Sequence, residues 1–169
     1  MTTTSETSTP LTAPTSDAPV PAAAPRINLK AKAPAFYQAM IALDRAAADG
    51  LDPVVSELVR VRSSQLNGCA YCVDMHTADA RQLGLTEQKL YGVAVWRETP
   101  FFTARERAAL ALAEAVTGLG AHGVPDAVYD EAARLFDEEE LSRLLAMCVT
   151  INAWNRIGVA SRLSPQVRG

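Results

Sequence analysis

Two cysteines and a histidine stand together in the segment NGCAYCVDMH, in a chain with only three cysteines and two histidines. Cys69 and Cys72 are three residues apart, and His76 follows four residues later. On a helix these spacings place all three side chains on one face. Paired thiols beside an imidazole can form and exchange disulfides, supply an activated sulfur nucleophile or bind a metal ion.

Glu57 is the carboxylate that we expect beside this group. The dipeptide Asn67-Gly68 is typical of a break between two helices. If the flanking helices fold back as an antiparallel hairpin, residues equally far from the turn become neighbours. Counting outward from the turn places Glu57 level with His76. A carboxylate at that depth could accept and donate protons during thiol chemistry.

The residues alone leave the chemistry open. Cys69, in the first turn of its helix, gains from the helix dipole, whereas Cys72 gains from His76 one turn away. The two thiols, the imidazole and Glu57 could instead hold zinc in a structural or regulatory domain. Glu57 and His76 could also act as acid and base in a decarboxylase or isomerase of a small carbonyl acid. The plainest alternative is that both cysteines are small buried hydrophobic residues.

The elements that must position these residues are all helical. Apolar residues recur at helical spacing, and no stretch has the alternation of a strand. Asp52 before Pro53, and Thr103 three residues before Glu106, are typical helix starts. The pattern predicts an all-α fold, a compact bundle of about seven helices with the Cys-x-x-Cys in a core hairpin. The predicted helices cover residues 34–50, 52–66, 69–83, 86–99, 103–120, from 125 onward, and 137–163.

Composition limits the partners and the location. The chain has 169 residues and a net charge of −3, which gives no reason to expect nucleic acid or an anionic membrane as partner. Residues 1–27 are rich in Thr, Ser, Pro and Ala, so we predict a disordered tail before a helical domain at 28–169. The tail lacks the basic start and apolar middle of a secretory signal. We therefore expect a cytoplasmic protein, and in that compartment paired cysteines more often serve chemistry or metal binding than structure.

The segment ELVRVRSSQLNGCAYCVDMHTADARQLG, residues 57–84, resembles the alkylhydroperoxidase D and carboxymuconolactone decarboxylase family. It reproduces the family pattern of Glu, Cys twelve residues later, Cys three later and His four later. Similarity continues through YGVAVWRETPFFTARERAALALAEAVT and INAWNRIGVASR, so it covers most of residues 34–163. The resemblance implies an all-helical homo-oligomer that reduces hydroperoxides as an antioxidant, with its cysteine pair and without a cofactor or metal.

The resemblance also implies a role for each site residue. Cys72 would be the peroxidatic thiolate, and Cys69 would condense with its sulfenic acid to give a disulfide. Glu57 and His76 would relay protons. A dithiol protein, lipoyl-bearing or thioredoxin-like, would reduce the pair again.

Two departures from the family pattern lie around the cysteines. The best-studied alkylhydroperoxidases carry a histidine between the two cysteines, where this chain has Ala70 and Tyr71. We assign Tyr71 either to packing or to a supporting hydroxyl. The family's decarboxylases lack the cysteine pair, so Cys69 and Cys72 argue against decarboxylation of a lactone.

Other chemistry-bearing residues have simpler assignments. We expect Cys148 in the core and His122 exposed in a glycine-rich loop. Residues 154–156 of the INAWNR segment would serve packing or subunit contact. Arg60 and Arg62 would face solvent or a neighbouring subunit.

Overall fold

The computed structural model describes residues 23–167. This part of the chain is built from helices, and its one strand-like feature is an isolated bridge between Gly120 and Gly123. The predicted all-α fold is therefore confirmed. The elements are α1 (Leu29–Lys32), α2 (Pro34–Ala48), α3 (Pro53–Leu66), α4 (Ala70–Gln82), α5 (Glu87–Gly92), the 3-10 helix η1 (Val93–Glu98), α6 (Ala104–Thr117), α7 (Asp126–Leu135) and α8 (Glu138–Ser161).

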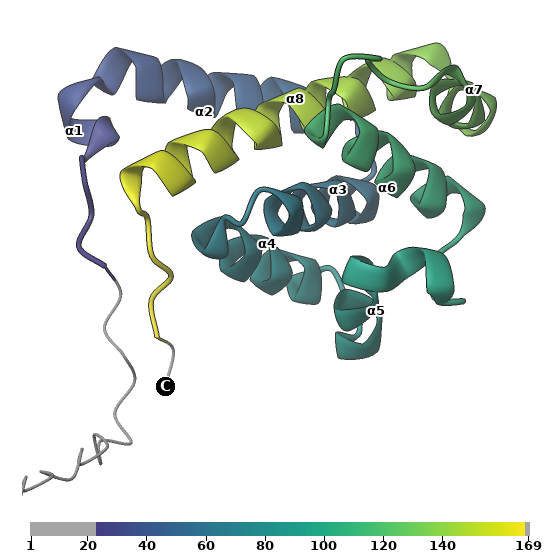
Figure 1. The fold of residues 1–169 in the computed structure, drawn as a ribbon, viewed down its shortest axis with the longest axis horizontal. Helices are drawn as coiled ribbons and strands as arrows, with labels where there is room; N and C mark the ends of the chain where they lie inside the picture. The colour runs from purple at the N-terminus through teal and green to yellow at the C-terminus, as the bar shows by residue number, and fades with distance from the viewer. Residues whose placement is uncertain (1–22, 168–169) are drawn as a thin grey trace, which may run out of the picture.

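Helix α3 is the central element of the bundle. It packs against α4, α6 and α8, while α2 runs along the long helix α8 (Figure 1). Val55 and Val59 enter one hydrophobic cluster, and Leu58 and Val61 enter a second. Full burial of such side chains contributes about 1.5–3 kcal/mol each. Because α3 is held from both sides, the position of Glu57 on it is fixed by the core.

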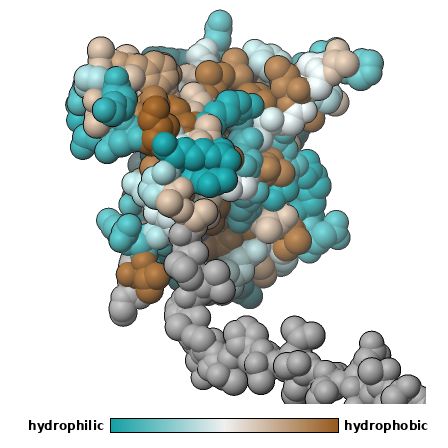
Figure 2. Space-filling view, turned by 60° about the vertical axis from the view of Figure 1, so that its left-hand side comes forward, coloured by the Kyte–Doolittle hydropathy of each residue, from teal (hydrophilic) through white to brown (hydrophobic). Residues whose placement is uncertain are grey.

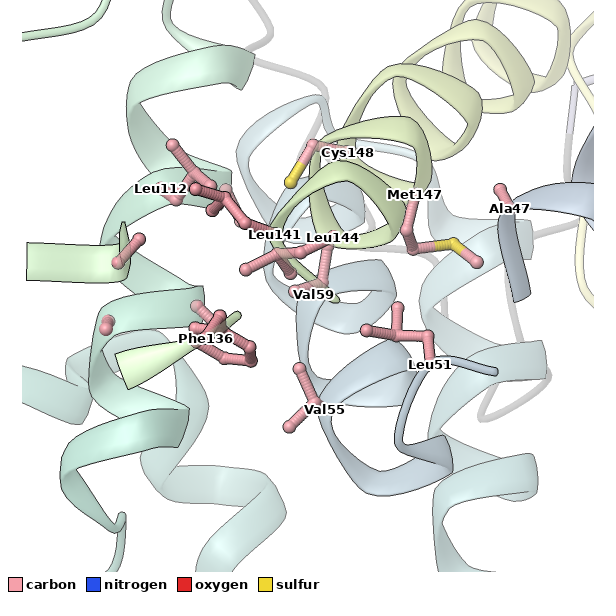
Figure 3. Packing of buried hydrophobic residues seen from close by; sticks show 14 of the residues in the cluster. Ala47, Leu51, Val55, Val59, Leu112, Phe136, Leu141, Leu144, Met147 and Cys148 are labelled. Carbon is pink, nitrogen blue, oxygen red and sulfur yellow. The ribbon is translucent and has the colours of Figure 1, made fainter. Parts of the chain in front are cut away.

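The larger cluster joins α3 to α6 and α8 (Figure 3). Leu112 of α6 and Leu144 of α8 are fully buried in it, and Phe136 closes the space before α8 begins. Cys148 lies in the same cluster with no exposed surface, so its predicted place in the core is confirmed. His122 is exposed, as predicted.

The predicted helix starts are confirmed by their caps. The side chain of Asp52 accepts hydrogen bonds from the backbone N–H groups of Val54 and Val55. Thr103 and Glu106 form a reciprocal capping box at the start of α6. These bonds satisfy backbone donors that have no partner within the helix.

One predicted helix is divided in the structure. Residues 86–99 were expected as a single helix, but α5 ends at Gly92 and the chain continues as η1, with a non-helical backbone at Val95. The tighter winding turns Trp96 into the second cluster, where its Nε1 donates to Oε1 of Glu114 at 2.9 Å. Tertiary packing of this tryptophan has thus outweighed the local helical pattern.

The N-terminal and C-terminal segments lie side by side (Figure 1). The backbone N–H of Arg26 donates to the carbonyl of Ser161 at 3.0 Å. Most of the predicted tail, residues 1–22, lies outside the described residues. One face of the described part of the chain carries hydrophobic side chains interspersed with hydrophilic ones (Figure 2). Within residues 23–167, no helix has both the length and the apolar character needed to cross a membrane.

Candidate active site

The turn between α3 and α4 is the element that presents the cysteines. Gly68 has a φ of +67°, a left-handed conformation that glycine adopts at little cost. The side-chain amide of Asn67 donates to Oδ1 of Asn152 at 2.8 Å and to Oδ1 of Asn155 at 2.9 Å. Both acceptors belong to α8. The turn is therefore tied to the helix that covers Cys69.

These asparagines belong to a larger buried polar network. Asn155 donates from Nδ2 to Oγ of Ser64 at 2.9 Å, and Asn152 donates to Oγ1 of Thr117 at 2.9 Å. Thr117 in turn donates to Oγ of Ser63 at 3.1 Å. Among the described residues, every buried side-chain N or O atom has a hydrogen-bond partner. Directional bonds of this kind fix how α3, α6 and α8 sit against one another more narrowly than apolar contacts do.

Cys69 and Cys72 form a disulfide, with 5.3 Å between their Cα atoms. Cys69 is the N-cap of α4, and its Sγ accepts a hydrogen bond from the N–H of Cys72 at 3.3 Å. Both residues are buried, at 2% and 4% exposure. The two sulfurs are therefore placed for reversible oxidation. In this state neither sulfur is a thiolate, so the alternative of a zinc site that uses both thiols would require the reduced protein.

The predicted meeting of Glu57 with His76 is confirmed. Oε2 of Glu57 lies 3.0 Å from Nδ1 of His76, and both residues are more than nine-tenths buried. An ionised carboxylate only accepts hydrogen bonds, so the ring proton then lies on Nδ1 and Nε2 remains to take another proton. The α3–α4 hairpin thus builds an acid–base pair one helical turn from Cys72.

Arg60 is a part of this site that sequence reasoning missed. We expected it at solvent or a subunit contact, but its side chain is only 12% exposed. Its guanidinium donates to Oε1 of Glu57 at 3.1 Å and to Oδ2 of Asp44 at 3.2 Å. A buried carboxylate needs such a partner to offset its lost hydration. The i, i+3 spacing of Glu57 and Arg60 on α3 was the available signal.

A cavity of about 350 Å³ opens beside Cys72 and His76. Its wall is largely apolar and aromatic, and the rings of Tyr37 and Trp154 meet edge to face in it at 5.3 Å. Cys69 borders a different, smaller cavity of about 170 Å³. A small molecule in the larger cavity therefore meets Cys72 first. Its apolar and aromatic lining residues are Tyr37, Ile41, Tyr71, Met75, Trp154 and Leu163.

Gly158 of α8 lies directly against the disulfide. A Cβ atom at this position would stand 2.8 Å from Sγ of Cys69 and 3.6 Å from Sγ of Cys72. The first distance is well inside van der Waals contact. The absence of a side chain lets α8 approach the cysteine pair this closely.

Comparison with known proteins places the chain in a family. The model of the carboxymuconolactone decarboxylase family matches residues 34–115. The chain is also 45% identical over 104 residues to the uncharacterized protein YdfG of Bacillus subtilis, which covers 62% of this chain and 71% of that protein. This chain belongs to the carboxymuconolactone decarboxylase family. The part of this chain that the family model matches includes Glu57, both disulfide cysteines and His76.

Two further proteins are similar to this chain in sequence or structure. The uncharacterized protein YnjA of Escherichia coli is 35% identical over 116 residues, covering 69% of this chain and 63% of that protein. A crystal structure from Agrobacterium tumefaciens, a protein of unknown function given as a putative antioxidant defence protein AhpD, has a TM-score of 0.83 at 37% identity. It aligns with 86% of this chain and all of its own.

More distant structures share the same fold. An uncharacterized peroxidase-related protein from Ralstonia eutropha, given as an alkylhydroperoxidase AhpD core, has a TM-score of 0.72 at 25% identity, covering 81% of this chain and 74% of its own. The debrominase Bmp8 has a TM-score of 0.71 at 23% identity, a likeness of fold alone. The fold and the cysteine pair thus point to the AhpD-like side of the family.

Proposed function

We propose that the protein is a thiol-dependent hydroperoxidase that acts through Cys72 and Cys69. The observation that carries this proposal is the arrangement around Cys72. Its sulfur borders an apolar cavity, is bonded to a second cysteine and lies one turn from the buried Glu57–His76 pair. Likeness to an AhpD-type structure at 37% identity supports the same chemistry.

In the first step the Cys72 thiolate attacks one oxygen of the hydroperoxide. An S–O bond forms and the O–O bond breaks, so sulfur is oxidised to a sulfenic acid and an alkoxide leaves. His76, which has taken the proton of the Cys72 thiol, returns it to the alkoxide to give an alcohol. Glu57 stabilises the imidazolium that exists between these transfers.

In the second step Cys69 attacks the sulfenic sulfur of Cys72. The S–S bond forms, the S–O bond breaks and hydroxide leaves as water with the proton of the Cys69 thiol. The N–H of Cys72, which donates to Sγ of Cys69 in the disulfide, favours a thiolate on Cys69. A dithiol donor of the lipoyl or thioredoxin class then reduces the disulfide and is itself oxidised.

Purified protein tests this function directly. It should consume an organic hydroperoxide only when a dithiol donor is supplied. Cys72→Ser should abolish turnover, whereas Cys69→Ser should accumulate a sulfenic acid that dimedone traps. Full activity in both variants, or decarboxylase or isomerase activity that survives the loss of both cysteines, would refute the proposal.

A further inference from the structure

Asp79 brings a third potential metal ligand to the Glu57–His76 pair. Each of the three residues offers one ligand atom, and these atoms all lie within 4.8 Å of one another. Asp79 follows His76 by three residues on α4, so both side chains share a face. Within residues 23–167, the carboxylate of Asp79 has no hydrogen bond or ion pair, and Asp79 is the most exposed member of the three.

The cluster can be reached from solvent along two routes. Asp79 borders the cavity that contains Cys72 and His76, and it also borders a second cavity of about 350 Å³ lined by Glu57 and Arg60. A small hydrated ion therefore has a path to both buried ligands. Two residues, Arg60 and Asp79, line both cavities.

The local charges favour a cation. The guanidinium of Arg60 is shared by two carboxylates, those of Glu57 and Asp44. It contacts Oε1 of Glu57 and leaves Oε2 facing the imidazole. Asp79 adds a further negative charge without an ion-pair partner in the described structure. The guanidinium of Arg60 thus stands against three carboxylates at this cluster, and Arg45 is a second cation in the lining of the larger cavity.

We propose that Glu57, His76 and Asp79 form a binding site for a divalent transition-metal ion of the zinc class. An imidazole combined with carboxylates suits Zn²⁺, whereas Mg²⁺ and Ca²⁺ prefer oxygen ligands alone. Ligand atoms around tetrahedral zinc are about 3.4 Å apart, given metal–ligand distances of about 2.1 Å. Binding would require the Asp79 side chain, the most exposed of the three, to rotate, so that its separations from the other two ligand atoms fall toward that value.

Metal binding at this site opposes the thiol chemistry. An ion bound to Glu57 and to a ring nitrogen of His76 occupies the carboxylate or imidazole atoms that would carry the proton, so an occupied site cannot relay protons to Cys72. In the reduced protein, Cys72 is one turn before His76 on the same face, and its thiolate becomes available as a fourth ligand. The site therefore binds metal more tightly in the reduced state and inhibits turnover. The inhibition rests on the proposed function, whereas the binding does not.

Cobalt binding tests the site itself. Metal-free protein in its disulfide form is titrated with Co²⁺ and followed by visible absorption, with Zn²⁺ added in competition. Asp79→Asn should weaken Co²⁺ and Zn²⁺ binding at least about tenfold, because one of three ligands is lost. Asp74→Asn is the matched control, since Asp74 is on the same helix but borders neither cavity. Reduction should add a thiolate-to-cobalt charge-transfer band.

A single-turnover assay tests the inhibition. Reduced protein is separated from donor thiols, which chelate zinc, and mixed with hydroperoxide at increasing Zn²⁺. Relative to its own metal-free rate, Asp79→Asn should need at least about ten times more Zn²⁺ for half-inhibition than wild type or Asp74→Asn. Equal metal affinity in wild type and Asp79→Asn, or absence of binding, would overturn the proposal. If the protein consumes hydroperoxide but binds neither Co²⁺ nor Zn²⁺, only the proposed metal site is refuted. If it binds metal but does not consume hydroperoxide, only the proposed peroxidase function is refuted.

Discussion

The side chains of Glu57 and His76 meet across the α3–α4 hairpin, with 3.0 Å between Oε2 and Nδ1. Neither residue is on the helix surface that faces solvent, since Glu57 is 7% and His76 4% exposed. Arg60 holds the far oxygen of the same carboxylate. The hairpin therefore carries a shielded carboxylate–imidazole pair whose geometry is fixed from two directions.

Glu57→Gln should slow oxidation of the reduced protein by about a hundredfold, the scale of a lost general acid–base group. The amide keeps the shape of the side chain but carries no negative charge to stabilise an imidazolium on His76. Stopped-flow oxidation by a hydroperoxide measures the effect. Glu98→Gln, an exposed substitution in η1, serves as the control. An unchanged rate in Glu57→Gln would show that the pair takes no part in thiol activation.

Asn67→Ala should lower the free energy of unfolding by about 1–3 kcal/mol, the cost of leaving a buried polar group unpaired. Its amide is the donor to Oδ1 of Asn155, which is fully buried. Urea unfolding measures the change, and the exposed Ser142→Ala should stay within about 0.5 kcal/mol of wild type. A loss no larger than that of the control would mean that the amide network does not hold the turn.

The meeting of Glu57 with His76 could be predicted from the sequence because it depends on local geometry. Residues rise by a constant distance along each helix, and Asn67-Gly68 fixes the point from which to count. The starts of α3 and α6 were predictable for the same reason, since capping by Asp52 and Thr103 is a short-range interaction.

Contacts between distant segments could not be predicted in this way. Nothing near Asn67 indicates that its amide reaches α8, more than 80 residues away. From the sequence alone, Gly158 is likewise an ordinary residue within a helix. Only the structure shows that it lies directly against Cys69. The division of the predicted helix 86–99 has the same cause, because Trp96 is drawn into a core that the local sequence does not describe.

Cys148 should remain unreactive in the native protein. Burial raises the pKa of its thiol to about 12, so almost no thiolate exists at neutral pH. Native reduced protein treated with iodoacetamide should therefore be alkylated at Cys69 and Cys72 only, and native oxidised protein at neither. Mass spectrometry of peptides gives the readout, with urea-unfolded protein as the positive control. Modification of Cys148 in the folded state would contradict this assignment.

The substitution Glu114→Gln should lower the free energy of unfolding at pH 7. This loss of stability should disappear in acid. Burial on its own raises the pKa of Glu114, but hydrogen bonds from Arg97, Trp96 and Arg62 outweigh it and hold the pKa below its usual 4.5. A depressed pKa contributes stability that is complete above the usual value and is lost as pH falls through the folded-state value.

The difference between wild type and Glu114→Gln should be about 1.5–3 kcal/mol at pH 7, the range for hydrogen bonds to a charged group. It should narrow steadily below about pH 4.5, where the carboxylate of the unfolded chain begins to bind protons. Urea unfolding across this range gives the curve. If wild type and Glu114→Gln differed in unfolding free energy by the same amount at pH 7 and in acid, the charge of Glu114 would not be what stabilises the fold.

Gly158→Ala distinguishes a required close approach from an ordinary helical glycine. In an exposed helix interior, Gly→Ala stabilises by about 1 kcal/mol because the unfolded chain loses freedom and the helix gains propensity. Here the new Cβ would stand 2.8 Å from Sγ of Cys69, so α8 or the disulfide must shift, at a typical overpacking cost of about 1–3 kcal/mol. The oxidised variant should therefore unfold at lower urea than wild type, while Val159→Ala, next to it on α8, should not share the clash. If the oxidised Gly158→Ala variant were instead stabilised by about 1 kcal/mol, α8 could shift without cost to accommodate the new Cβ. The close approach of α8 to the cysteine pair would then not depend on a glycine at position 158.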